Sequence, residues 1–80
     1  MDREQNIFLS NVKWLRKHHN LSKKQMSALL GISVYSLSKI ENGILPPNVD
    51  VSIFFKIHRQ FGIRPAEQLT ILLENTSLME

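Results

Sequence analysis

Apolar residues recur every three or four positions along this chain, which is the spacing of one face of an α-helix. In residues 5–18 the recurring positions are Ile7, Phe8, Val12 and Leu15, with Trp14 beside them. The same spacing returns in four further stretches, and no segment alternates apolar and polar residues with period two. The pattern therefore predicts an all-α fold, a compact set of five short helices around one core.

Two of the predicted helices are very short and follow one another, at residues 22–30 and 34–41. Ser22 and Gln25 have the spacing of a capping box at the start of the first. Ser33 is in place as the N-cap of the second. Gly31 stands between them, where a side chain would obstruct a tight turn. The apolar face of the pair consists of Met26, Leu29, Leu30, Leu37 and Ile40.

Asparagine, glycine and proline mark the ends of the first three helices. Asn20 suits a left-handed residue after the helix at 5–18. Asn42 and Gly43 both tolerate positive φ, and they end the helix at 34–41. Pro46-Pro47 then predicts an extended loop.

Similar signals bound the last two helices. The fourth starts at Asp50 or Asn48 and ends at Gly62. Pro65 suits the first turn of the fifth helix. This helix carries an apolar face of Leu69, Leu72 and Leu73, with Ile71 outside it. Residues 75–80 are expected to fray.

The composition fits one globular domain spanning residues 1–80, because 80 residues are too few for a second core. The chain has no cysteine, which excludes a disulfide framework and a thiolate zinc site. Its apolar runs are far shorter than a membrane span, and its first residues lack the layout of a signal peptide. We expect a soluble, cytoplasmic protein with no membrane partner.

The net charge of +3 is unevenly distributed. Residues 5–40 contain no Asp or Glu, and the rest of the chain sums to −3. A basic half favours a surface for a polyanion, although short basic stretches are also common as ordinary solvated surface. The six basic residues of this stretch are Lys13, Arg16, Lys17, Lys23, Lys24 and Lys39.

The two short helices, the glycine turn and the basic stretch together are typical of a helix-turn-helix that binds DNA. Residues 7–70 resemble the DNA-binding domain of phage lambda repressor and Cro, the family often called XRE-type. The motif covers about residues 22–41. The resemblance is carried by Val12 to Arg16, Leu21-Ser22, Met26-Ser27, Leu30 to Ser33, Leu37 to Gly43, Phe61 to Ile63 and Leu69.

The resemblance implies a role for each exposed position of the motif. The helix at 34–41 would enter the major groove of double-stranded DNA, and its base-reading residues would be Val34, Tyr35, Ser36 and Lys39. Helix starts and the turn after the motif would bind phosphate, through Lys23, Lys24, Ser33, Asn42 and Gly43. The family often has glutamine at the position of Lys23, and lysine favours a phosphate clamp there.

Three further positions qualify the match. Arg16 and Glu41 correspond to a family ion pair between the first and third helices, so their implied role is structural. Ile44 stands where many members have a basic residue, which removes one phosphate anchor. The loop at 44–49 is about two residues longer than the common pattern.

Other chemistry finds little support in the sequence. His18 and His19 are adjacent, hence on different helix faces, and His58 is distant, so we expect no metal site. The chain has no nucleophile elbow and no glycine-rich phosphate loop, and it is too short to enclose a reaction pocket. We therefore expect no enzyme activity, no catalytic residues and no cofactor.

The sequence leaves two functions open. The first is a sequence-specific transcriptional regulator that pairs as a homodimer on a two-fold operator. Candidate dimer contacts are Leu72, Leu73, Leu78 and Met79, with Ile71 or Phe55. The alternative is a protein-interaction module, such as the antitoxin or accessory factor of a toxin–antitoxin pair. It would keep the same fold and bind a partner protein as its main ligand.

Overall fold

The structure, a computed structural model, describes residues 3–76. Within that range the chain forms five α-helices and one 3₁₀ helix, and no β-strand. The all-α prediction is therefore confirmed. The elements are α1 (Arg3–His18), α2 (Lys23–Leu30), α3 (Val34–Glu41), α4 (Ser52–Phe61), α5 (Pro65–Thr70) and η1 (Leu73–Asn75).

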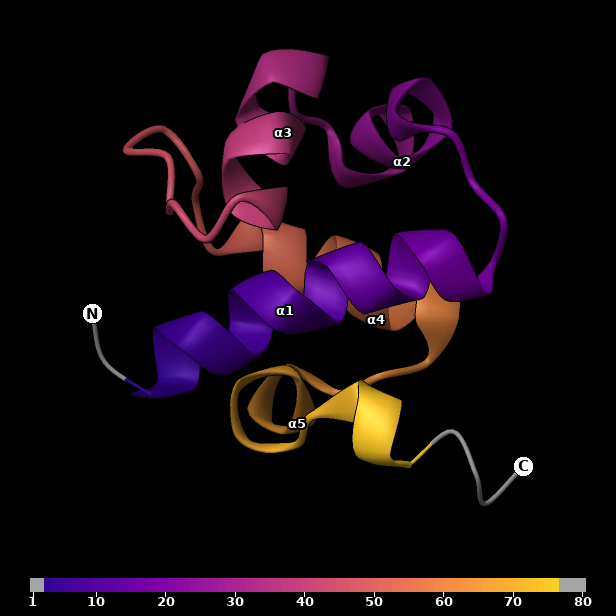
Figure 1. Cartoon of the computed structure of the whole chain (residues 1–80), viewed down its shortest axis with the longest axis vertical. Helices are drawn as coiled ribbons and strands as arrows, with labels where there is room; N and C mark the ends of the chain where they lie inside the picture. Colours follow the sequence, from indigo (N-terminus) through magenta and orange to yellow (C-terminus); the bar gives the residue numbers. More distant parts are fainter. Residues whose placement is uncertain (1–2, 77–80) are drawn as a thin grey trace.

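Helix α1 is the central element of the fold (Figure 1). Helices α2 and α3 lie on one side of it, and α5 with η1 lies on the other. Phe8 of α1 contacts Phe54 of α4, with ring centroids 4.8 Å apart. The most deeply buried side chains come from α1 to α4, so these four helices share one core. They include Val12, Leu15, Met26, Leu30, Leu37, Ile40, Ile53 and Ile57.

The predicted helix caps are confirmed. The Ser22 hydroxyl accepts the Gln25 amide at 3.0 Å, and the Gln25 side chain accepts the Ser22 amide at 2.8 Å. The Ser33 hydroxyl accepts the Ser36 amide at 3.0 Å. Asn20 is left-handed, with φ of 56°. Since each of these signals depends only on residues within one turn, the sequence was sufficient to place them.

Several boundaries differ from the prediction. Helix α1 begins at Arg3, two residues earlier than expected. Helix α4 begins at Ser52, whose amide donates to the Asp50 carboxylate at 2.7 Å, so Asp50 caps the helix from two residues away. Only Gly43 after α3 has positive φ, at 82°, whereas Asn42 has φ of −93°.

The C-terminal part of the chain departs most from expectation. Helix α5 ends at Thr70, and the chain re-forms a turn in η1 instead of continuing one helical face through Leu73. Two residues of the segment that was expected to fray are described: Asn75 belongs to η1, and the Thr76 amide donates to the Leu73 carbonyl at 3.0 Å. Residues 77–80 lie outside the described range.

A buried network of side-chain hydrogen bonds explains why α5 ends at Thr70 and the chain turns into η1. The Asn11 amide group of α1 donates to the carbonyls of Gln68 at 3.0 Å and Ile71 at 2.7 Å, and its oxygen accepts the Leu73 amide at 2.9 Å. Gln68 in turn donates to the carbonyls of Phe54 and Ile63. The bonds from Asn11 satisfy backbone groups at the end of α5 and the start of η1 that an uninterrupted helix would have paired within itself.

Leu73 is buried in the core through this arrangement, so it is not available as the dimer contact that we expected. Leu78 and Met79, two other expected contacts, lie outside the described residues. Among residues 3–76, no helix is long and apolar enough to cross a membrane.

Candidate nucleic-acid interface

Helices α2 and α3 form a rigid pair whose geometry depends on two small residues. Gly31 has φ of 68°, a left-handed conformation that glycine adopts without strain. A side chain there would also approach the Lys56 ammonium group, which lies directly beside the turn. Ser27 is buried, and its hydroxyl donates back to the Lys24 carbonyl at 2.9 Å. The pair therefore matches the turn that the sequence predicted.

The outer face of α3 carries Val34 and Tyr35, which are exposed as predicted, and Lys39, which is half-buried. Tyr35 is 71% exposed, the largest value among the exposed large hydrophobic residues. The Lys39 ammonium group lies 5.0 Å from the centre of the Tyr35 ring, which is a cation–π distance. The two side chains, one turn apart, thus present a cation on an aromatic face at the surface of α3.

Ser36 corrects one of the sequence predictions. It was expected on the exposed face of α3, but it is only 4% exposed. Its hydroxyl accepts a hydrogen bond from the Ser33 hydroxyl at 3.1 Å, and its amide is the one that Ser33 caps. Position 36 lies on the inner side of the first turn of α3, so its side chain completes the cap and does not face outward.

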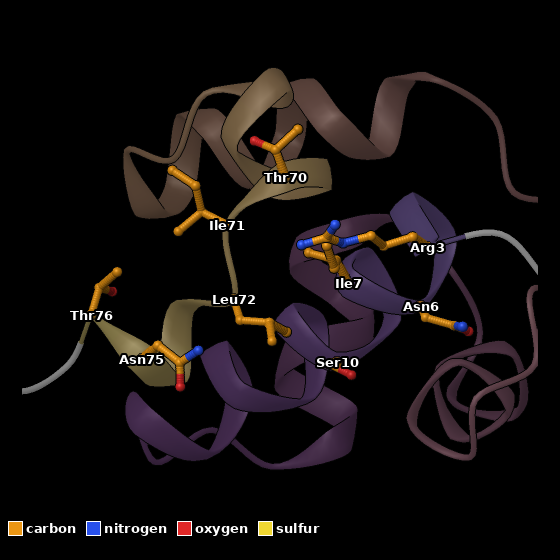
Figure 2. Close-up of a pocket in the computed structure, with 9 residues that line it drawn as sticks. All are labelled: Arg3, Asn6, Ile7, Ser10, Thr70, Ile71, Leu72, Asn75 and Thr76. Atoms are coloured by element: carbon orange, nitrogen blue, oxygen red, sulfur yellow. The ribbon is translucent and has the colours of Figure 1, made fainter.

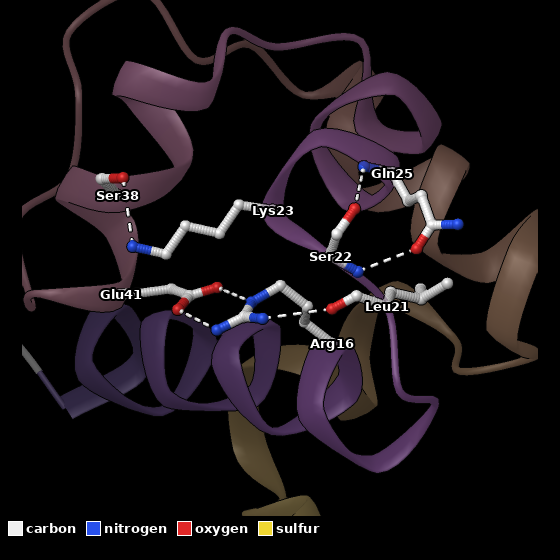
Figure 3. Close-up of polar contacts among 7 residues, drawn as sticks. All are labelled: Arg16, Leu21, Ser22, Lys23, Gln25, Ser38 and Glu41. Atoms are coloured by element: carbon white, nitrogen blue, oxygen red, sulfur yellow. Dashed lines mark hydrogen bonds and ion pairs between the residues drawn. The ribbon is translucent and has the colours of Figure 1, made fainter.

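The start of α2 faces the same side as α3. Lys23 is the first residue of α2, and its ammonium group donates to the Ser38 hydroxyl of α3 at 3.3 Å (Figure 3). Lys24 is exposed beside it. Because the α2 amides before Gln25 point out of the helix start, two lysines and free N–H groups are gathered at one site. This is an arrangement that favours an anion.

Arg16 and Glu41 form the predicted ion pair between α1 and the end of α3. The Arg16 guanidinium donates to both carboxylate oxygens of Glu41, at 2.5 and 2.9 Å, and to the Leu21 carbonyl at 3.1 Å (Figure 3). The side chains are 16% and 6% exposed. The hydrogen bonds that Arg16 donates to Glu41 raise the pKa of Arg16, so this residue stays charged. The positive charge of Arg16 is therefore paired with Glu41 inside the fold.

The positive surface of residues 5–40 is therefore made of lysines alone. Of the six basic residues in that stretch, Arg16 is neutralised by Glu41, and the five lysines remain. Asn42 and Gly43 are exposed at the end of α3, as a backbone contact would require. Ile44, next in the chain, is exposed and apolar.

His18 and His19 belong to a row of ring contacts between Trp14 of α1 and Phe61 of α4. Trp14 stacks on His18 with ring centroids 4.3 Å apart, and His19 lies 4.9 Å from Phe61. Within residues 3–76, no three His, Cys, Asp or Glu side chains are grouped so that they could hold a metal ion.

Sequence reasoning missed Ser38, Lys56, Asn11 and Gln68. Ser38 and Lys56 contact residues far away in the chain, at the start of α2 and at the glycine turn. The one available signal was for Asn11 and Gln68, which occupy positions on otherwise apolar helix faces. A polar residue at such a position is buried only when the tertiary structure supplies partners.

A comparison with protein families finds that residues 12–68 match a model described as helix-turn-helix. The match covers well over half of the 80 residues and contains the whole α2–α3 pair. Neither the curated proteins nor the solved structures include a match to this chain.

Proposed function

The chain belongs to the XRE-type helix-turn-helix family of DNA-binding regulators, like lambda repressor and Cro, and we propose that α3 reads a half-site of an operator. In this proposal the protein is a cytoplasmic, sequence-specific transcriptional regulator. The supporting observation is the outer face of α3, where exposed Val34 and Tyr35 lie beside half-buried Lys39 on a pair of helices held by caps, core and an internal ion pair.

Each of these side chains has a suitable base contact. Lys39 can donate to the O6 and N7 acceptors of guanine, and Val34 can pack on a thymine methyl group. Tyr35 can contact a base edge with its hydroxyl while its ring supports the Lys39 ammonium group. Ser36 has no part in base reading in this proposal because it is buried.

Phosphate contacts set the register of α3 on the duplex. We assign them to Lys23 and Lys24 at the start of α2, to Ser33 at the start of α3, and to Asn42 and Gly43 after it. The hydrogen bond between Lys23 and Ser38 holds the Lys23 ammonium group beside α3 before DNA arrives. A positioned cation loses less freedom on binding, which favours the complex.

Fluorescence anisotropy tests the division between base and phosphate contacts. The preferred site is first selected from a random DNA pool. Lys39→Ala should then cost about 1–3 kcal/mol on that site and relax the preference at one base position. Lys23→Ala should weaken binding to all sequences alike and reduce the salt slope by about one. Arg59→Ala, an exposed cation on α4, is the matched control and should change neither.

Two results would contradict the assignment. If Lys39→Ala and Lys23→Ala lose the same affinity on preferred and scrambled duplexes, Lys39 contacts only phosphate. If the unmodified protein prefers no duplex at all, sequence-specific regulation is wrong.

We also propose that the protein binds its operator as a homodimer, since one such module makes few base contacts. The expected contacts that stay available among the described residues are Ile71 and Leu72 on one surface, and Phe55 on α4. Sedimentation equilibrium of Ile71→Asp and Phe55→Asp separates the two surfaces, because only the variant on the true interface should become monomeric.

One observation favours a protein partner as a second function. Leu45, Val51 and Phe55 are all exposed, and Leu45 and Val51 border a common apolar pocket at the start of α4. Exposed apolar groups that lie together are typical of interaction sites. If a neighbouring reading frame encodes a toxin-like protein, its complex with this chain should be lost in Val51→Lys while DNA binding is kept.

A further inference from the structure

A pocket lies between the first half of α1 and the segment that joins α5 to η1 (Figure 2). Its volume is about 760 Å³, within the usual range of roughly 300–1,000 Å³ for small-molecule sites. The residues that line it are Arg3, Asn6, Ile7, Ser10, Thr70, Ile71, Leu72, Asn75 and Thr76.

The lining is divided between apolar and polar groups. Ile7, Ile71 and Leu72 supply apolar surface, and amide and hydroxyl groups stand around them. Arg3 is the one charged residue of the lining, which contains no Asp or Glu. In Figure 2 the Arg3 side chain extends from the start of α1 toward the middle of the lining residues.

From this chemistry we propose that the pocket binds a small amphipathic carboxylate. A guanidinium group presents two parallel N–H donors, which match the two oxygens of a carboxylate. The apolar surface of Ile7, Ile71 and Leu72 takes the hydrocarbon part of the same molecule. The neighbouring amide and hydroxyl groups can bond any remaining polar atom of the ligand.

The far wall of the pocket is held in place by the buried network. Asn11 binds the carbonyl of Ile71 at 2.7 Å and the amide of Leu73 at 2.9 Å, so the linker with Leu72 between them is fixed on α1. A pocket whose wall is preformed does not have to be ordered by its ligand, which favours binding.

The site is separate from the proposed DNA surface. Helix α1 lies between the α5–η1 side, where the pocket is, and the side occupied by α2 and α3 (Figure 1). The proposal therefore goes beyond DNA binding, and it can be tested in the absence of DNA. It is compatible with a homodimer formed through Phe55, because a dimer contact at Ile71 and Leu72 would cover the pocket.

Nuclear magnetic resonance titration of the full chain with octanoate, below its micelle concentration, provides the test. Octanoate should shift the methyl signals of Ile7, Ile71 and Leu72. Arg3→Gln should weaken binding about tenfold, the equivalent of one lost charge-assisted contact. Arg59→Gln, the same change on an exposed residue of α4, should leave the affinity unchanged. Octan-1-ol, which has no carboxylate, should bind about tenfold more weakly than octanoate.

The opposite results overturn the proposal. Equal binding of octanol and octanoate, or unchanged affinity in Arg3→Gln, would show that no carboxylate is recognised. Shifts confined to Leu45 and Val51 would place the ligand at the start of α4, and no shift at millimolar octanoate would exclude the site. These results do not depend on whether the protein binds DNA, because the titration contains no DNA.

Discussion

The ion pair between Arg16 and Glu41 offers the sharpest test of how the DNA-binding face is held. Glu41→Gln keeps the size of the side chain and one acceptor oxygen. The second oxygen, which accepts a hydrogen bond from Arg16, is replaced by an NH₂ group that cannot accept one. The Arg16 guanidinium then faces a donor, and only its bond to the Leu21 carbonyl is unaffected.

The structure sets the size of the effect. Hydrogen bonds that involve a charged group are worth about 1.5–3 kcal/mol, and one of the two to Glu41 is lost. Removing a partner from a fully buried pair costs about 3–5 kcal/mol, but Arg16 is 16% exposed and retains some contact with water. We therefore expect the free energy of unfolding to fall by about 2 kcal/mol. For a domain of this size, the melting temperature should then fall by roughly 8–16 °C.

Urea and thermal unfolding, followed by circular dichroism and by the fluorescence of Trp14, measure this change. Glu67→Gln is the matched control, because Glu67 forms a surface ion pair with Arg64, and those side chains are 34% and 72% exposed. Its effect should be much smaller, since exposed pairs contribute little. If Glu41→Gln leaves stability intact and tightens binding to scrambled DNA, Arg16 contacts phosphate and the structural role is wrong.

Three further predictions concern single sites. Gly31→Ala should lower the free energy of unfolding by about 1–2 kcal/mol, because Gly31 has φ of 68°. Since that strain lies in the backbone, adding Lys56→Ala should not restore the melting temperature. Asn11→Ala should cost about 3 kcal/mol in urea unfolding, because it leaves buried backbone groups without partners. Hydrogen bonds from Ser52 lower the pKa of Asp50, so this cap contributes stability above the ordinary aspartate pKa of about 3.9 and loses it as the pH falls through the lowered value. The Ser52 amide signal should follow that titration, and a signal that does not move below about pH 4 would exclude the cap.

The sequence by itself determined the local features of this protein. Ser22 with Gln25, Ser33 and Asn20 act on backbone groups within one helical turn, so their neighbours in the chain decide their role. The apolar spacing also placed the helices, because it is a pattern among residues of the same helix. Together with the family pattern, it also located the α2–α3 pair that the helix-turn-helix match contains.

Only the tertiary structure decided which side of an element a polar residue faces. Ser36 is buried where α3 packs on the rest of the fold, and the Lys23 ammonium group of α2 donates to the Ser38 hydroxyl of α3. The end of α5 depends on Asn11, whose partners lie about 60 positions along the chain. Such partners cannot be recognised from sequence spacing, because a buried polar group is stable only where packing brings a donor or acceptor to it.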